Sequence, residues 1–166
     1  VRDDGKTMEV LGSSKRRLEA EYYLPHLAHA TMEPPVATAH IVNGQCEVWA
    51  PVQAPEAARN IVAEKLSLKV EQVTVHVTLL GGGFGRKSKP DFVAEAALIS
   101  KALDGKPVKL QWTREDDIRH DYLHAVSVQR FEAALYVKGM PTALLHRSAA
   151  PTISSTFQQV TMRQAT

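Results

Sequence analysis

The stretch ATAHIVNGQCEVWA, residues 37–50, is the part of this sequence that decides the fold class. Hydrophobic and polar residues alternate over 37–42 and again over 45–50, as in half-buried strands. Asn43-Gly44 lies between the two segments and tolerates both positive φ angles of a type I′ turn. The stretch therefore predicts a β-hairpin.

The segments on either side of the hairpin predict further strands and helices. Alternating patterns predict strands over residues 16–24, 37–42, 45–50, 72–78, 108–112, 126–137 and 143–149. Helical spacing predicts helices over 55–66 and 91–103, and a cap-like pattern at 113–116 predicts a short helical turn. Hairpins combined with single crossover helices indicate an α+β fold: a mixed sheet with two main helices in the order β-ββ-α-β-α-β-ββ.

Composition predicts one globular domain over residues 1–166, with a core over about 16–150 and a poorly defined segment at 151–166. With 20 basic and 18 acidic residues the net charge is +2, which gives no electrostatic footprint for nucleic acid. The longest apolar runs are only a few residues long, so no transmembrane segment is predicted. Because the sequence starts at Val1 rather than at a methionine, we expect a fragment of a larger subunit.

Four of the five residues at 81–85, GGGFG, are glycines, and they directly follow a predicted strand. Such a loop exposes main-chain N–H groups that bind electron-rich groups. The spacing approaches that of a P-loop, but Arg86 stands where that motif has glycine before Lys87 and Ser88. From the spacing alone, a packing turn, a cradle for an anion or cofactor and a nucleotide-binding P-loop all stay open. A non-catalytic interaction domain is a further alternative.

The histidines and carboxylates do not form a metal motif. His26 and His29 are three residues apart and His120 and His124 are four apart, but neither pair belongs to a His-Glu-x-x-His pattern. Surface or hydrogen-bonded histidines are the simpler interpretation. Glu33 and the acidic run at 115–117 are explained by solvation and helix capping. Cys46 is the single cysteine, so no internal disulfide is expected, and no direct metal ligand is predicted.

Four segments in this order resemble one known family. They are YLPHLAHATMEP at 23–34, VWAPVQ at 48–53, GGGFGRK at 81–87 and WTREDD at 112–117. Together they resemble the molybdenum-binding large subunit of the xanthine dehydrogenase and aldehyde oxidase family. Within it they are most similar to the isoquinoline 1-oxidoreductase β subunit and membrane-bound aldehyde dehydrogenases, with His120-Asp121-Tyr122 also matching. The resemblance runs over about residues 16–150, a minor part of a family subunit.

The resemblance implies that this chain carries part of a molybdenum–pterin site, usually in the cytosine dinucleotide form in bacteria. Gln53 would donate its amide toward the cofactor, Phe84 would border the substrate channel, and the Gly85 N–H would lie near the apical oxo ligand. The implied cofactor-binding set is Gln53, Gly82, Gly83, Phe84, Gly85 and Arg86. We therefore expect the Gln53 carboxamide to lie beside the loop at 81–85.

Ser88 is the second residue assigned to the substrate channel. It stands where purine-oxidising members carry a glutamate, which argues against xanthine as the substrate. The catalytic base of the family, a glutamate far toward the C-terminus of the subunit, has no counterpart in this sequence, so no catalytic residue is assigned here.

The resemblance also implies a reaction and partners. The reaction is the hydroxylation of an aldehyde or an electron-poor N-heterocycle, with water as the source of oxygen. The implied partners are the remainder of the molybdenum subunit, an iron–sulfur subunit that takes the electrons, and a small aldehyde or heterocyclic substrate. We expect this chain alone to lack the cofactor and to be inactive. The compartment stays open between bacterial cytoplasm and periplasm.

Overall fold

The structure is a computed structural model that describes residues 4–152. The chain forms two compact units, one made of the described residues up to Leu27 and from His124 onward, the other of Ala28–Leu123. The single domain predicted over 1–166 stays a prediction. Most of the segment predicted to be poorly defined, residues 153–166 of 151–166, lies outside the described residues.

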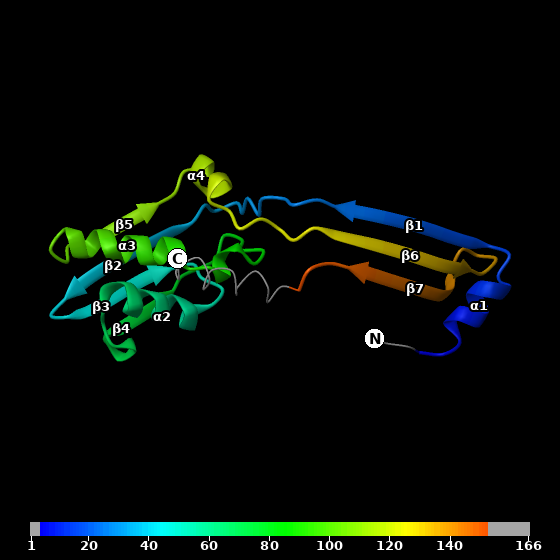
Figure 1. Cartoon of the computed structure of the whole chain (residues 1–166), viewed down its shortest axis with the longest axis horizontal. Helices are drawn as coiled ribbons and strands as arrows, with labels where there is room; N and C mark the ends of the chain where they lie inside the picture. Colours follow the sequence, from blue (N-terminus) through cyan, green and yellow to red (C-terminus); the bar gives the residue numbers. More distant parts are fainter. Residues whose placement is uncertain (1–3, 153–166) are drawn as a thin grey trace. The chain divides into compact units, whose positions relative to one another are not determined.

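The first unit is a three-stranded antiparallel sheet in the order β1-β6-β7, preceded by a short helix (Figure 1). Its elements are α1 (Thr7–Ser13), β1 (Arg17–Leu24), β6 (Ser127–Leu135) and β7 (Pro141–Ala149). The turn between β6 and β7 contains Gly139 at φ +80°, whose N–H donates to the Tyr136 carbonyl at 2.8 Å. All three strands were predicted; α1, which buries Leu11, was not.

The second unit is built on a four-stranded mixed sheet in the order β4-β3-β2-β5. Its strands are β2 (Val36–Val42), β3 (Gln45–Ala50), β4 (Val73–Val77) and β5 (Val108–Gln111). Its helices are α2 (Pro55–Leu66), α3 (Asp91–Ala102) and α4 (Arg114–Arg119), with single 3-10 turns η1 (Val70–Gln72) and η2 (Arg86–Ser88). The hairpin of β2 and β3 is confirmed, with Asn43 at φ 51° and Gly44 at φ 74°.

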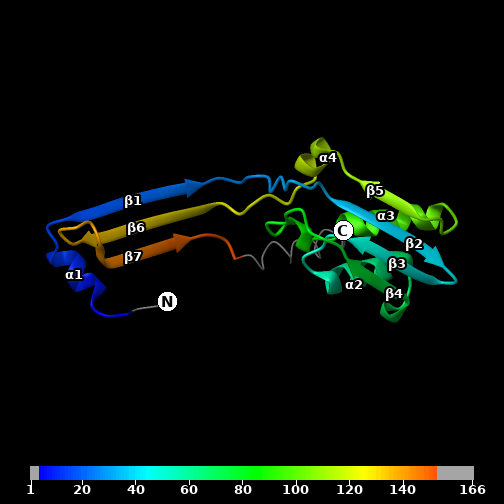
Figure 2. The same cartoon turned by 180° about the vertical axis from the view of Figure 1, so that it is seen from behind.

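Helices α2 and α3 pack side by side on one face of this sheet (Figures 1 and 2). Alternate residues of the strands are buried beneath them, such as Ala37 and Ala39 of β2 and Cys46 and Val48 of β3. The helices contribute Ala58, Val62, Ala63, Leu66, Phe92, Val93, Ala96 and Ala97 to the same core. The core of this unit therefore lies between one face of the sheet, formed by alternate strand residues, and the helix faces on which side chains recur every 3.6 residues.

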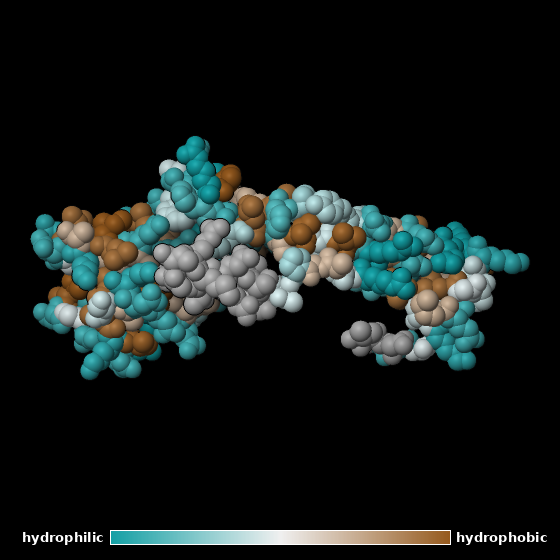
Figure 3. All heavy atoms as spheres, in the orientation of Figure 1, coloured by the Kyte–Doolittle hydropathy of each residue, from teal (hydrophilic) through white to brown (hydrophobic). Residues whose placement is uncertain are grey.

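The outer side of α3 is also partly apolar. Figure 3 shows hydrophobic residues gathered over the part of this unit where α3 lies. Leu98 and Ile99 of α3 are 41% and 38% exposed. The sequence pattern predicted a buried helix, and the structure buries one side of it. Among the described residues, no helix has the length and apolar character needed to span a membrane.

Strands β3 and β4 are parallel neighbours, joined through α2. Their last residues, Ala50 and Val77, are paired, and the N–H of Thr78 donates to the carbonyl of Ala50 at 3.2 Å. The segments that follow the two strands therefore start at the same edge of the sheet. Binding sites on open sheets with parallel strands commonly form beyond such carboxyl ends.

The α+β class and the mixed sheet are confirmed. The strands divide between two sheets because β1 pairs with β6 rather than with the β2–β3 hairpin. Alternation in a sequence gives the face that each residue occupies, but not the strand with which it pairs.

Candidate cofactor site

The loop that follows β4 meets the segment that follows β3 at Gln53. The Oε1 atom of Gln53 accepts a hydrogen bond from the Gly85 N–H at 3.0 Å, and the Gln53 N–H donates to the Lys87 carbonyl at 3.0 Å. The expected proximity of Gln53 and the loop at 81–85 is thus confirmed. Its Oε1 is engaged, so Nε2 is the end of the carboxamide that can donate outward.

The loop backbone requires glycine at two positions. Gly82 and Gly85 have φ angles of 96° and 99°, which residues with a side chain rarely adopt. Phe84 between them also has a positive φ, 52°. At Gly83 the restriction is steric, because a Cβ there would overlap the Gln53 side chain, with Cγ at 3.1 Å. Each glycine thus permits either the turn or the close approach of Gln53.

The loop presents main-chain donors. Within residues 4–152, the N–H groups of Gly82, Gly83 and Phe84 donate to no protein acceptor. The Gly85 N–H, which the resemblance places near an oxo ligand, donates to Gln53 Oε1 in this structure. The main-chain donors of the loop that have no protein acceptor within residues 4–152 are therefore those of the three residues before Gly85.

The loop is fixed to the segment at 28–33 by a partly buried ion pair. Lys87 Nζ lies 2.6 Å from Glu33 Oε2, and the same oxygen accepts the Gly81 N–H at 3.1 Å. The Lys87 side chain is fully buried, whereas that of Glu33 is 33% exposed. In the return direction, the Glu33 N–H donates to the Gly81 carbonyl at 3.0 Å. Lys87 is thus engaged in a structural pair, and the P-loop alternative gains no support.

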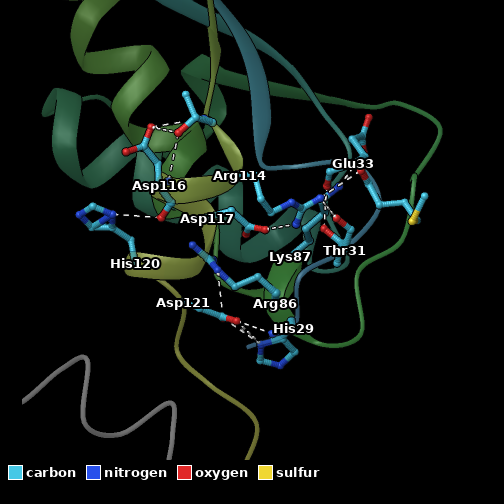
Figure 4. Close-up of polar contacts among 12 residues, drawn as sticks. His29, Thr31, Glu33, Arg86, Lys87, Arg114, Asp116, Asp117, His120 and Asp121 are labelled. Atoms are coloured by element: carbon cyan, nitrogen blue, oxygen red, sulfur yellow. Dashed lines mark hydrogen bonds and ion pairs between the residues drawn. The ribbon is translucent and has the colours of Figure 1, made fainter. Parts of the chain in front are cut away.

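Arg86, which is labelled in Figure 4, lies in a second cluster and has a fully buried side chain. Its guanidinium makes two 2.9 Å hydrogen bonds to the Asp91 carboxylate and one of 3.1 Å to the Lys89 carbonyl. The aromatic rings of Trp112 and Tyr122 lie 5.3 and 5.1 Å from it. A cofactor contact by the Arg86 guanidinium stays a prediction, and the structure commits this group to protein partners.

Burial around this cluster perturbs two neighbouring groups. Desolvation lowers the pKa of Lys89, with the nearby Arg86 charge adding to the effect. Desolvation raises the pKa of Tyr122, and the Asp91 carboxylate raises it further. The neutral phenol of Tyr122 is therefore favoured beside the guanidinium.

His29 and Asp121 form a pair that the sequence patterns did not predict. His29 Nδ1 lies 2.8 and 3.1 Å from the two oxygens of the Asp121 carboxylate, which also accepts the His29 N–H. Asp121 Oδ1 is 3.6 Å from Arg86 Nε. Figure 4 shows Asp121 between the guanidinium and the imidazole. Separation by 92 residues hides the pair from any spacing rule, although both residues lie in segments that carry the resemblance.

The other carboxylates named in the sequence have structural partners. Thr113 and Asp116 cap α4 reciprocally, as the pattern at 113–116 predicted, and these hydrogen bonds lower the pKa of Asp116. Asp117 is buried and pairs with Arg114, which also bonds the Thr31 carbonyl. In the described part of the chain, no group of three His, Cys, Asp or Glu residues is arranged to hold a metal ion.

The two residues assigned to the substrate channel lie on either side of Gly85. Phe84 exposes 66% of its surface. Ser88 ends η2 and is half-buried. Their roles in a channel stay predictions.

The sequence is similar to those of known proteins. The family model described as "Molybdopterin cofactor-binding domain" matches residues 2–165. The membrane-bound aldehyde dehydrogenase (pyrroloquinoline-quinone) of Gluconacetobacter polyoxogenes is 37% identical over 148 residues, 89% of this chain and 19% of that protein. Isoquinoline 1-oxidoreductase subunit beta of Brevundimonas diminuta is 34% identical over 122 residues, 73% of this chain and 16% of that protein.

Solved structures share the fold. The aldehyde oxidoreductase of Desulfovibrio gigas aligns with a TM-score of 0.64 at 21% identity, over 88% of this chain and 16% of that one. This chain spans less than a fifth of the length of these relatives. Because the family model covers nearly the whole sequence, this chain belongs to the molybdopterin cofactor-binding domain family of the xanthine dehydrogenase and aldehyde oxidase type.

Proposed function

We propose that this chain forms one wall of the molybdenum–pterin site of an oxidoreductase that hydroxylates aldehydes or electron-poor N-heterocycles with oxygen from water. The observation that carries the proposal is the hydrogen bond between the Gln53 carboxamide and Gly85, which joins two segments at one sheet edge. Membership of the cofactor-binding family supports it. The names of the two relatives, an aldehyde dehydrogenase and an isoquinoline oxidoreductase, support the substrate class.

The residues of the loop fit such a group. Its donors are the N–H groups of Gly82, Gly83 and Phe84 together with Gln53 Nε2, and all of them are neutral. Neutral donors bind oxo and phosphate oxygens without adding a formal charge beside a redox centre. With no Cβ at Gly83, the Gln53 side chain can lie directly against the loop backbone. The arrangement suits a ligand rich in acceptor oxygens.

The chain's own residues would hold and orient this group. When bound, the molybdenum–pterin cofactor supplies the two-electron redox chemistry of the hydroxylation. Gln53 would fix the orientation of the group through Nε2, since Oε1 is held by Gly85. The exposed ring of Phe84 would offer an apolar face to the substrate and exclude water. Ser88 adds no charge to the channel, in keeping with an uncharged aldehyde or heterocycle.

We further propose the cytosine dinucleotide form of the pterin and an iron–sulfur subunit as the electron acceptor. The remaining walls of the site and the catalytic base would come from the rest of the molybdenum subunit. This chain alone would then be inactive.

The experiment measures what the holoenzyme that contains this chain binds. Molybdenum is determined by mass spectrometry of the metal, and the organic group is extracted and identified as a pterin or as pyrroloquinoline quinone, which the name of one relative contains. Molybdenum with a pterin supports the proposal. A quinone without molybdenum would overturn it.

Two matched variants assign the binding to the loop. Gly83→Ala should lower the molybdenum content because its Cβ would displace Gln53, and Gln53→Ala should lower it by removing the carboxamide. Gln45→Ala changes an exposed amide at the start of β3 and should leave the content unchanged. Full occupancy in both loop variants would show that the cofactor binds elsewhere.

A further inference from the structure

The imidazole of His29 lies near the Cβ position of Gly85, and the Gln53 carboxamide lies at its main-chain nitrogen. The His29 Nε2 atom is 3.8 Å from the position that a Cβ on Gly85 would occupy, whereas Gln53 Oε1 lies 3.0 Å from the Gly85 nitrogen. The imidazole thus lies where any residue other than glycine at position 85 would carry its side chain. A side chain at Gly85 would therefore start in contact with His29 Nε2.

Asp121 fixes the orientation of this ring. Its carboxylate accepts the main-chain N–H of His29, which fixes the carboxylate beside the ring, and it also bonds Nδ1, so the ring cannot rotate without breaking that bond. The His29 side chain is 9% exposed and that of Asp121 is 1% exposed. Because Nδ1 is directed to Asp121, Nε2 is the nitrogen that faces the loop.

Asp121 is itself held in place by the Arg86 cluster. Arg86 Nε is 3.6 Å from Asp121 Oδ1 and has no hydrogen-bond partner among residues 4–152. Arg86 belongs to η2, which directly follows Gly85. The chain of contacts therefore runs from the loop through Arg86 and Asp121 to His29 and back to the loop at Gly85. Such a closed set of contacts resembles the support that oriented histidines receive from carboxylates at metal and cofactor sites.

We propose that His29 is a further cofactor-contacting residue, which hydrogen-bonds the bound molybdenum–pterin group through Nε2, and that Asp121 is its positioning residue. This inference rests on the proposed function. It extends the site from the main-chain donors of the glycine loop to a side chain from the segment at 28–33. Two side-chain groups next to Gly85, a carboxamide and an imidazole, then contribute to the site.

Two substitutions separate a contact through Nε2 from a purely structural pair. His29→Asn places an amide where Nδ1 stands, so it keeps the bond to Asp121 and removes the group at Nε2. His29→Gln places its amide at the Nε2 position and loses the bond to Asp121. If Nε2 contacts the cofactor, His29→Asn should release the pterin faster than His29→Gln does. If the pair with Asp121 is purely structural, His29→Gln should release it faster.

The readout is the rate at which the purified holoenzyme releases its pterin on dilution, followed by the fluorescence of the oxidised pterin. We expect His29→Asn to accelerate release about tenfold or more, the effect of losing one hydrogen bond to a charged group. His29→Gln should release the pterin at nearly the wild-type rate. His76→Asn, a change to an exposed ring stacked on Trp49, is the matched control and should have no effect.

A second measurement needs no variant and applies even when His29→Asn does not fold. Nitrogen NMR of histidine-labelled protein should show a shift of the His29 Nε2 resonance on cofactor loading, with Nδ1 unchanged. Equal release rates in the two variants, or an Nε2 resonance that does not move, would overturn the role of His29. A wild-type holoenzyme that contains no molybdopterin would instead overturn the proposed function.

Discussion

Replacing Glu33 by glutamine should open the glycine loop more than removing its lysine partner does. Glu33→Gln leaves the ammonium of Lys87, which is fully buried, beside a neutral amide. Removing one partner of a buried ion pair costs about 3–5 kcal/mol because the remaining charge is uncompensated. We take about 3 kcal/mol, the lower end of that range, because the Glu33 side chain is 33% exposed.

Lys87→Met has a smaller predicted effect. The carboxylate that remains reaches solvent and still accepts the Gly81 N–H at 3.1 Å. A buried methionine also replaces the aliphatic part of the lysine without a charge. We expect this variant to lose about 1 kcal/mol, the usual worth of a partly exposed polar contact.

Hydrogen exchange followed by mass spectrometry measures this difference locally. The reporting amides are those of Glu33, Gln53 and Gly81, each of which bonds across the contact between the loop and its neighbours. At about 1.4 kcal/mol per tenfold change, Glu33→Gln should accelerate their exchange roughly 100-fold and Lys87→Met about fivefold. Amides in the middle of α3 serve as the internal control. Faster exchange in Lys87→Met than in Glu33→Gln, or no change in either, would refute the reasoning.

Three further predictions concern single groups. Arg86→Lys should lower the free energy of unfolding by about 2 kcal/mol, because one ammonium cannot bind both Asp91 oxygens and also stack between two aromatic rings. Thermal unfolding measures this loss, and an unchanged midpoint temperature would contradict the prediction. Burial raises the pKa of the Cys46 thiol from 9.0 to about 11, so its contribution to stability is full below pH 9 and is lost as the pH rises to 11. Alkylation of the Cys46 peptide at pH 8 should therefore follow unfolding, and rapid labelling of the native protein would disprove it. Gly85→Val should abolish cofactor loading while the circular dichroism spectrum is kept, since φ is 99° there and the side chain would point toward His29; a fully loaded valine variant is the opposing result.

Local signals accounted for most of the secondary structure. Asn43-Gly44 predicted the hairpin because few dipeptides adopt two successive positive φ angles, and the structure has both. Pro55 and the pattern at 113–116 correctly placed the starts of α2 and α4. The short helix α1 was missed, because a single buried residue, Leu11, gives no periodic pattern.

The candidate site was only partly predictable. Gln53 came from the resemblance, and its meeting with Gly85 depends on the parallel pairing of β3 and β4, which no local pattern specifies. The pairs of His29 with Asp121 and of Lys87 with Glu33 join residues 92 and 54 positions apart. The lysine looked like part of a nucleotide-binding motif because a sequence gives the spacing of a charged residue but not its burial.

The parallel pairing of β3 with β4 also bears on how this site can change over evolutionary time. In each strand, the residues of the ladder from Cys46↔Val73 to Ala50↔Val77 end before the site segment that follows that strand. Insertions or exchanges after residue 50 or after residue 77 would therefore leave the strand register intact. Grafting such loops from relatives with other substrates offers a practical route to new specificities on an unchanged scaffold.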